Sequence, residues 1–213
     1  MFSGKLKSKK TDWDSYYNKP YGTASYSRRI SERVLVRIMK RFLGGNYHQE
    51  VAELGGANSC FFEAICRELQ PSVYCAIDNN QTGLKKFKER ILPKVVDARF
   101  ADVFDLKIDK RFDVVFSFGL IEHFDEEGTN LAIKAHFDLL KEDGVAVIFF
   151  PTPTFLYRLT RKLAEFLRIW IFFDERPLTF QEVEKEVLKY STILHKEINW
   201  PIFLTQGIIV CRK

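Results

Sequence analysis

The sequence contains no run that approaches the roughly 20 consecutive apolar residues of a membrane-spanning helix. Its first residues, MFSGKLKSKKTDWD, lack the apolar core of a secretory signal. The four cysteines include no C-x-x-C pair, and their spacing fits neither a zinc site nor a disulfide framework, so no metal site is predicted. These absences predict a cytoplasmic protein with reduced thiols.

The length of 213 residues suits one domain and is short for two. Hydrophobic residues make up 46% of the chain and charged residues 29%, as in ordinary globular proteins. The net charge of +5 is uneven, because residues 1–50 hold 11 Lys and Arg against 4 Asp and Glu. This basic segment suits an anionic partner such as nucleic acid, a phosphorylated substrate or an acidic membrane, or it is a solvated tail and helix face.

The chain alternates short apolar strands with amphipathic helices. A helix is expected over residues 25–43, where apolar residues recur at helical spacing before a Gly-Gly pair. Further helices are expected at 59–69, 80–92 and 126–143, and strands at 50–54, 73–78, 95–102, 112–119 and 145–151. Apolar strands separated by helices predict a parallel sheet that is covered on both faces.

After Pro151 the alternation stops. Residues 155–173 form a long amphipathic stretch that predicts a helix. Thr179 and Glu182 stand at capping-box spacing and predict another helix start. The last 23 residues indicate two strands joined near Trp200, which predicts an antiparallel hairpin at the edge of the sheet.

The first strand runs into a bend with the sequence VAELGGANS. Gly55 and Gly56 allow a sharp turn and a close approach of the backbone to a ligand. A G-x-G-x-x-G dinucleotide loop would need two further glycines, but Ala57 and Ser59 occupy the later small positions. The bend therefore suits a pyrophosphate poorly.

Two carboxylates follow at strand ends. Asp78 ends the second strand about 25 residues after Glu53, a spacing typical of a residue that accepts ribose hydroxyls; alternatively, it caps the next helix. Asp102 ends the third strand, where it could accept a hydrogen bond from an adenine amine while the backbone N–H of Val103 meets the ring. The alternative for Asp102 is an Asx-turn.

The fourth strand runs into FGLIEHF. In parallel α/β sheets, ligands bind at the carboxyl ends of the strands, so this loop should face the same crevice as Gly55 and Asp78. His123 lies in the loop and could act as a general base near neutral pH. Alternatively, His123 hydrogen-bonds the backbone and shapes the loop.

Together, VAELGGANS, YCAIDN, ARFADVFDL, FDVVFSFGLIEHF and LLKEDGVAVIFFP resemble the successive motifs of class I S-adenosylmethionine-dependent methyltransferases over about residues 48–151. The resemblance implies a Rossmann-like three-layer α/β/α fold with a seven-stranded, mostly parallel sheet whose last strand is antiparallel. It implies S-adenosyl-L-methionine as cofactor and S-adenosyl-L-homocysteine as product. The cofactor-binding residues it implies are Glu53, Gly55, Gly56, Ala57, Ser59, Asp78, Asn79, Asp102, Val103, Phe118, Gly119 and Leu120.

The resemblance also narrows the chemistry. No N/D-P-P-Y signature follows the fourth strand, which argues against methylation of the amino groups of adenine, cytosine or glutamine. No Pro-Cys nucleophile follows it either, which argues against cytosine C5 chemistry. His123 is the residue expected to deprotonate or orient the acceptor.

We expect one methyltransferase domain over 1–213, with two additions that cover the acceptor site. The first is the basic, aromatic and helical segment 1–45, in which Tyr16, Tyr17 and Tyr21 cover the ligand or pack the segment onto the domain. The second is the insertion 152–178. Within it, the basic and aromatic stretch 155–173 predicts contact with an anionic membrane, or else a lid or dimer face.

The leading functional interpretation is methyl transfer to a small-molecule acceptor. An RNA methyltransferase is the alternative that the basic N-terminal segment suggests, but no separate RNA-binding module accompanies it. A methyltransferase acting on a lipid-linked or membrane-associated substrate is the alternative that 155–173 suggests. A Rossmann-type oxidoreductase and a non-catalytic binder of the cofactor are further hypotheses.

Overall fold

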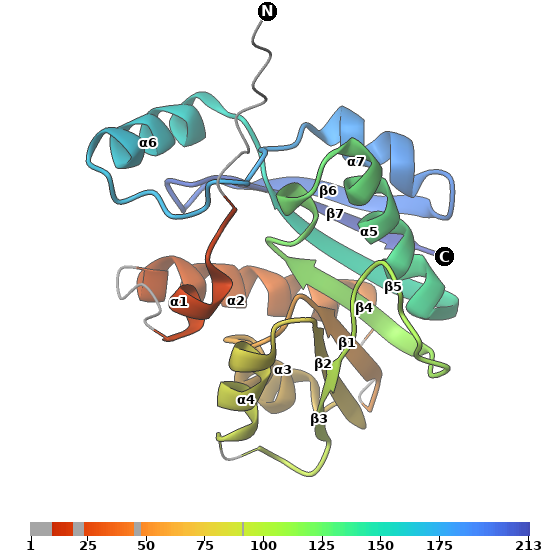
Figure 1. The fold of residues 1–213 in the computed structure, drawn as a ribbon. Coiled ribbons are helices and arrows are strands. Elements are labelled where there is room, and N and C mark those ends of the chain that lie inside the picture. Colours follow the sequence, from red (N-terminus) through yellow and green to blue (C-terminus); the bar gives the residue numbers. More distant parts are fainter. Residues whose placement is uncertain (1–9, 19–23, 45–47, 91) are drawn as a thin grey trace, which may run out of the picture.

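The computed structural model describes residues 10–18, 24–44, 48–90 and 92–213 (Figure 1). One sheet runs in the order β3-β2-β1-β4-β5-β7-β6, and β7 is antiparallel to both of its neighbours. The predicted seven-stranded sheet is thereby confirmed. Its strands are β1 (Glu50–Leu54), β2 (Val73–Asp78), β3 (Val96–Phe100), β4 (Phe112–Phe118), β5 (Leu140–Pro151), β6 (Thr192–Asn199) and β7 (Gln206–Arg212).

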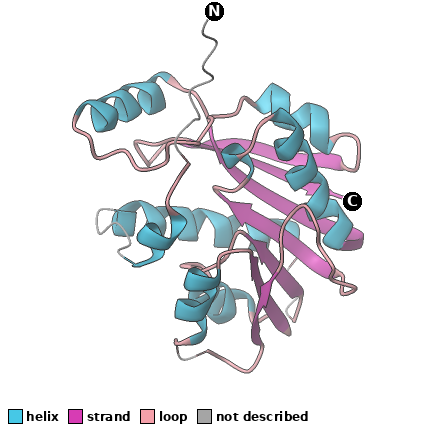
Figure 2. Cartoon of the chain, in the orientation of Figure 1, coloured by secondary structure: helices cyan, strands magenta, loops and turns pink. Residues whose placement is uncertain are grey.

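Helices cover both faces of the sheet, as Figure 2 shows. The helices are α1 (Trp13–Asn18), α2 (Ala24–Phe42), α3 (Phe62–Leu69), α4 (Gln81–Lys88), α5 (Glu126–Leu139), α6 (Phe155–Phe166) and α7 (Phe180–Val187). Apolar residues of α2, α3 and α4 pack on one face, and those of α5 and α7 pack on the other. The helix expected over 25–43 is confirmed as α2.

The period of two along each strand divides the core between the faces. In β4, Val114 and Phe116 pack toward Ile65 of α3, whereas Val115 packs toward Ile133 of α5. All five side chains are fully buried. A strand buried on both faces has no polar side to alternate with, which explains the continuous apolar runs in the sequence.

The C-terminal predictions are confirmed. β6 and β7 form an antiparallel hairpin with β6 at the sheet edge. The side chain of Thr179 accepts a hydrogen bond from the backbone of Glu182, whose carboxylate bonds back to Thr179, so the capping box starts α7.

Several predicted boundaries are wrong. The helix expected over 80–92 ends at Lys88, and the strand expected over 145–151 begins at Leu140. The helix expected over 126–143 ends at Leu139, because Leu140 already pairs with Phe112 of β4. The helix expected over 155–173 ends at Phe166, and the chain then turns at Arg168, where φ is +56°. The strand expected over 95–102 is β3, which ends at Phe100 where its pairing with β2 stops. Each boundary depends on pairing or backbone geometry that the hydrophobic pattern does not encode.

Gly83, in the first turn of α4, lies against α1 and the glycine bend. A Cβ at this position would lie 2.6 Å from the Cβ of Ala57 and 2.9 Å from the ring of Tyr17. We expect Gly83→Ala to lower the free energy of unfolding by about 1–3 kcal/mol and to displace α1. Urea unfolding measures this change. Gln81→Ala, at an exposed position of the same turn, is the control and should change stability by less than about 0.5 kcal/mol. Equal stability of Gly83→Ala and the wild type would contradict the contact.

Candidate functional site

A cavity of about 880 Å³ opens at the carboxyl ends of β1, β2 and β4. Its walls come from the glycine bend, the end of β2, the loop after β4, helix α1, and the segment 172–175. β1 and β4 are neighbours in the sheet, while their following helices α3 and α5 lie on opposite faces. This is the strand-order switch at which ligands bind in open α/β sheets.

The glycine bend is shaped by backbone geometry. Gly55 has φ +76°, and its N–H and that of Gly56 both donate to the carbonyl of Ile77 at 2.9 and 3.3 Å. A Cβ on Gly56 would lie 2.9 Å from the carboxyl carbon of Glu53. Gly55 therefore provides the turn, whereas Gly56 makes room for the Glu53 side chain rather than for a ligand.

Glu53 lies beneath the bend. Its carboxylate accepts a hydrogen bond from the hydroxyl of Tyr74, which in turn is 3.0 Å from the hydroxyl of Ser59. Burial raises the pKa of Glu53 to about 7, although hydrogen bonds from Ser59 and Tyr74 partly offset the effect. The carboxyl group thus braces the loop from below while still contributing to the cavity wall.

Asp78 joins β2 to the bend. Its carboxylate accepts hydrogen bonds from the backbone N–H of Ala57 at 3.1 Å and of Asn80 at 2.7 Å. The side chain that caps α4 is that of Asn80, which accepts from the N–H of Gly83. Asp78 therefore does not cap the helix, and its carboxylate lies on the cavity wall with capacity for further donors. Burial raises its pKa to about 6.

Asp102 lies two residues beyond the end of β3. One carboxylate oxygen accepts from the N–H of Phe104 at 2.9 Å, which is an Asx-turn, and the other accepts from the amide of Asn79 at 3.0 Å. Asp102 is not on the cavity wall, whereas Asn79 and Val103 are. The Asx-turn alternative is thus what the geometry shows for the carboxylate.

The loop after β4 carries a buried acid. Phe118, Gly119 and Leu120 line the cavity, and Glu122 lies beneath Gly119 with 2% of its surface exposed. One of its carboxylate oxygens is buried without a hydrogen-bond partner among the described residues. Burial raises the pKa of Glu122 to about 8, with a smaller opposing effect of His123.

His123 lies between carboxylates. Its Nδ1 is 3.0 Å from a carboxylate oxygen of Asp174, and its Nε2 is 3.9 Å from one of Glu122. Burial alone would lower the pKa of His123, but the hydrogen bond to Asp174 and the charge of Glu122 outweigh it and raise the pKa above its ordinary value. The same hydrogen bond lowers the pKa of Asp174, against the effect of burial. His123 is thus held between the carboxyl groups of Asp174 and Glu122.

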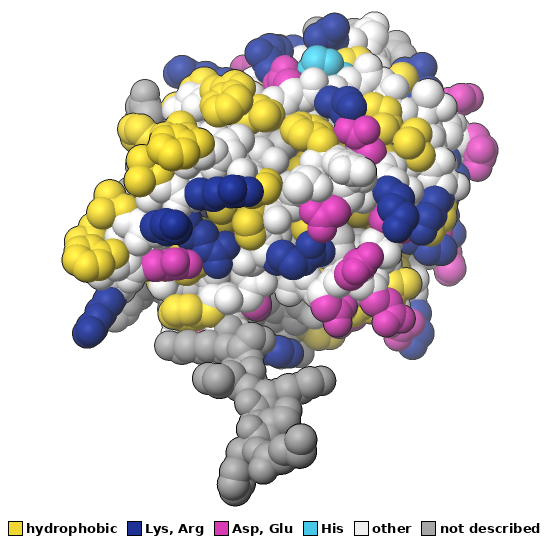
Figure 3. Space-filling model, turned by 90° about the horizontal axis from the view of Figure 1, so that it is seen from above, with side chains coloured by type: hydrophobic (Ala, Val, Ile, Leu, Met, Phe, Trp, Pro, Cys, Tyr) yellow, Lys and Arg dark blue, Asp and Glu magenta, His cyan; other side chains and the backbone are white. Residues whose placement is uncertain are grey.

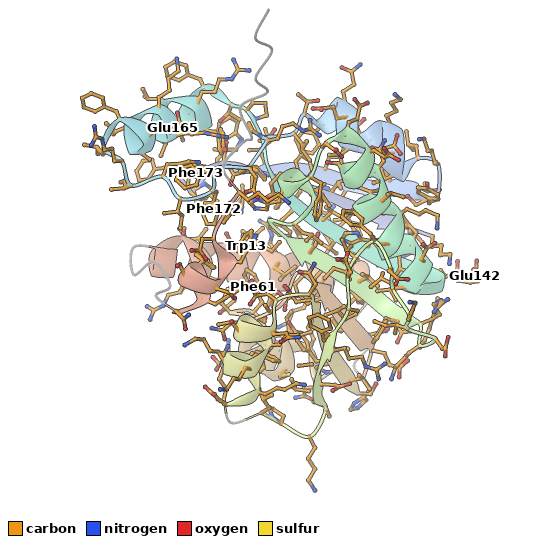
Figure 4. The ribbon with its side chains drawn as sticks, in the orientation of Figure 1. Trp13, Phe61, Glu142, Glu165, Phe172 and Phe173 are labelled. Carbon is orange, nitrogen blue, oxygen red and sulfur yellow. The ribbon has the colours of Figure 1, made fainter. Side chains whose placement is uncertain are left out.

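A roof of aromatic and polar residues covers this side of the cavity. Figure 4 shows Trp13 and Phe172 facing each other there, and their ring centroids are 6.0 Å apart. Trp13 also meets the His123 ring edge-on at 4.9 Å. Thr11 ties the N-terminal segment to the roof, because its N–H donates to Asp174 at 3.2 Å and its hydroxyl donates to the same carboxylate.

Of the 16 residues predicted from the sequence, 12 lie on the cavity wall, three do not, and one falls outside the described residues. The wall contains Glu53, Gly55, Ser59, Asp78, Asn79, Val103, Phe118, Gly119, Leu120, His123, Tyr16 and Tyr17. Outside the lining are Gly56, Ala57 and Asp102, and Tyr21 falls outside the described residues. Tyr17 also packs on Gly83. The same side chain therefore lines the cavity and packs α1 onto the domain.

The wall residues that sequence reasoning missed include Glu122, Tyr157, Phe172, Asp174 and Glu175. For the three acids among them, the signal was charge inside apolar runs, in LIEHF and FFDER. Glu175 accepts a hydrogen bond from the hydroxyl of Tyr157, which links the roof to α6. The ligand atoms of Glu122, His123 and Glu175 lie within 4.8 Å of one another, close enough to hold a metal ion.

Comparison with known proteins relates this site and fold to a known family. The family described as "Methyltransferase domain" matches residues 51–144, which include the glycine bend, Asp78 and the loop after β4. Residues 51–144 thus match a methyltransferase domain. The search of curated proteins finds no match to this chain.

Solved structures share the fold of the methyltransferase. Magnesium protoporphyrin IX methyltransferase from Synechocystis PCC 6803, with bound S-adenosylhomocysteine, has a TM-score of 0.72 at 11% identity over 94% of this chain and 92% of that one. The N-methyltransferase NodS from Bradyrhizobium japonicum WM9 has a TM-score of 0.63 at 13% identity over 85% and 86%. An S-adenosylmethionine-dependent methyltransferase from Clostridium acetobutylicum ATCC 824 has a TM-score of 0.62 at 17% identity over 82% and 88%.

Among the described residues of the methyltransferase, no helix has the length and apolar character needed to cross a membrane.

The buried Glu122 should make stability depend on pH. Its pKa of about 8 in the folded chain exceeds the ordinary 4.5, so between these values the folded state binds more protons than the unfolded state. The free energy of unfolding therefore falls as pH rises through this window. We expect Glu122→Gln to be similar to the wild type at pH 5 and more stable by on the order of 2–4 kcal/mol at pH 9. Urea unfolding at both pH values measures the difference, with the exposed Glu127→Gln as control. A difference that does not change with pH would contradict the burial of the charge.

The His123–Asp174 pair should be visible in the titration of the imidazole. We expect the His123 ring signal in NMR spectra to titrate with a midpoint above 6.5, because the paired carboxylate favours the protonated ring. Asp174→Asn should lower this midpoint and leave the other histidine signals in place. His123→Gln assigns the signal. A midpoint that Asp174→Asn does not move would show that the two side chains are not paired.

Proposed function

We propose that the methyltransferase binds S-adenosylmethionine in the half of the cavity next to the glycine bend and transfers its methyl group to a small-molecule acceptor under the roof. The observation that carries the proposal is that one cavity is lined both by residues of the glycine bend and by residues of the roof. The volume of about 880 Å³ falls in the range of about 300–1,000 Å³ that is typical of small-molecule sites.

The residues next to the bend fit an adenosyl ligand. Asp78 presents a carboxylate that is already held by two backbone N–H groups, which leaves it oriented to accept ribose hydroxyls. Gly55 keeps the bend open, since a side chain there would meet Leu120 at 3.2 Å. Val103 and Asn79 line the wall where an adenine would lie. S-adenosylmethionine, when bound, supplies the activated methyl group of its sulfonium.

The protein aligns the reactants and excludes water. The roof closes the acceptor side with Trp13, Phe172 and Tyr16, whose rings are in mutual contact. Alignment and a dry site are the main contributions that a protein makes to a displacement of this kind. The insertion 152–178 and the segment 1–45 are, in this proposal, the parts that cover the acceptor.

His123 is proposed as a positioning residue. Its Nδ1 pairs with Asp174 and its Nε2 faces Glu122. Neither nitrogen therefore faces the position that the acceptor molecule would occupy. A raised pKa also favours the protonated ring, which cannot accept a proton. Where the acceptor must lose a proton, the carboxyl group of Glu122 on the wall can take it only above a pH of about 8, where this group is ionised.

The charge of the cavity favours a small molecule over RNA. Six carboxyl groups line the wall against three Lys and Arg side chains, and a phosphate backbone needs an excess of positive charge. The carboxyl groups are those of Glu53, Glu63, Asp78, Glu122, Asp174 and Glu175, and the cations are Lys10, Arg28 and Arg90. A salt-dependent affinity for RNA would support the RNA alternative instead.

Calorimetry with S-adenosylhomocysteine and with NAD tests the cofactor site. We expect heat of binding with S-adenosylhomocysteine and none with NAD. Asp78→Ala should weaken the affinity by about 10- to 100-fold, because charge-assisted hydrogen bonds to the ribose are lost. Below a pH of about 6 the wild type should also lose affinity, since Asp78 then becomes protonated. Asp97→Asn, on the neighbouring strand and paired with Arg99, is the control and should bind normally. Absence of binding at about millimolar S-adenosylhomocysteine would overturn the proposal.

A further inference from the structure

Helix α6 exposes its apolar side chains to solvent. The exposed fractions are 82% for Phe155, 54% for Leu159, 55% for Leu163 and 83% for Phe166. These positions recur at helical spacing and therefore form one face of the helix. A surface helix of a globular protein ordinarily turns its apolar face toward the core, whereas α6 turns this face toward solvent.

The inner face of α6 is attached by polar contacts. Tyr157 is buried and donates to Glu175 in the roof. Arg161 donates to the carbonyl of Glu175 at 3.0 Å and lies 5.0 Å from the centre of the Trp170 ring. The helix is therefore held in place by Tyr157 and Arg161, and its outward apolar face is not needed for that attachment.

Cations flank the apolar face. Arg158, Lys162 and Arg168 are exposed and make no ion pair within the part of the chain that the structure describes. The acidic residue of the helix, Glu165, is paired with Arg161 at 2.9 Å. Figure 3 shows hydrophobic side chains and Lys or Arg side chains intermixed on the left half of this view, the side on which Figure 1 places α6.

We propose that this surface of α6 docks on an anionic lipid bilayer. We call it the α6 surface, and it consists of the four exposed apolar residues and the three flanking cations. Aromatic and leucine side chains beside Lys and Arg are the combination that inserts at the headgroup boundary of anionic lipids. The inference goes beyond methyl transfer and requires no acceptor to be known.

A second copy of the chain fits this surface poorly. A two-fold contact through α6 would bring each cation of the surface close to the same cations of the other copy. An anionic bilayer instead pairs them with headgroups while the apolar residues leave water. Because Tyr157 lies both on α6 and on the cavity wall, docking would hold the acceptor side of the cavity close to the lipid surface.

Co-sedimentation of the full chain with vesicles tests the proposal. We expect binding to vesicles of phosphatidylcholine mixed with phosphatidylglycerol, weak binding to phosphatidylcholine alone, and a decrease with added salt. Phe155→Ser with Phe166→Ser should reduce the partition coefficient by about tenfold or more. Phe100→Ser, which removes a side chain 59% exposed on β3, is the matched control and should bind as the wild type does.

A second pair of variants distinguishes the effect of the α6 cations from the effect of the net charge of the chain. Arg158→Glu with Lys162→Glu and Arg168→Glu should abolish the preference for phosphatidylglycerol. Lys85→Glu with Lys86→Glu and Lys88→Glu changes the net charge equally on α4 and should retain the preference. Calorimetry with S-adenosylhomocysteine checks that every variant keeps its cofactor site, so a loss of lipid binding is not a loss of fold.

Any one of four results would overturn the proposal. The wild type could stay in the supernatant with phosphatidylglycerol vesicles. The Phe155→Ser and Phe166→Ser variant could bind as well as the wild type, or the α4 variant could lose as much binding as the α6 variant. Finally, light scattering could show a dimer that Phe155→Ser with Phe166→Ser converts to a monomer, which would assign the α6 surface to a second copy of the chain.

Discussion

The adjacency of β1 and β4 in the middle of a parallel sheet is the constraint on which the site depends. The chain leaves β1 toward the face covered by α3 and leaves β4 toward the face covered by α5. Neither following helix can then fill the space above the junction. The strand order therefore creates the cavity, and the first residues after each strand form part of its walls.

Those walls are unusually acidic for a partly closed space. Burial makes ionisation unfavourable and raises the pKa values of Glu53, Asp78, Glu122 and Glu175. The positive charges of His123 and Arg161 partly offset the effect of burial at Glu175. A sulfonium is itself a cation, so a wall of this kind is electrostatically suited to hold it, and the same wall disfavours a phosphate-rich ligand.

The half of the site next to the glycine bend could be predicted from the sequence, and the roof could not. Gly55, Asp78 and Phe118 follow apolar strands directly, and strand ends of a parallel sheet meet at one edge, so local pattern was sufficient. The pairing of His123 with Asp174 spans 51 residues and follows from no periodicity. The true end of α6 depends on a left-handed residue at Arg168, a conformation that arginine rarely adopts. For Asp102 the sequence left two alternatives open, and the structure shows the Asx-turn, in which its carboxylate accepts a hydrogen bond from the N–H of Phe104.

The contact between Thr11 and Asp174 joins residues 163 positions apart. Contacts of such long range carry a large entropic cost of chain closure, so they form after the shorter-range pairings of the sheet and its helices. On the ribosome, α1 leaves the exit tunnel first, yet its partner in the roof is made only when most of the chain has been synthesised. Helix α1 can pack on α4 earlier, through Tyr17 and Gly83, but the contact of Thr11 with Asp174 must wait, so the cavity of the nascent domain is open before it is covered.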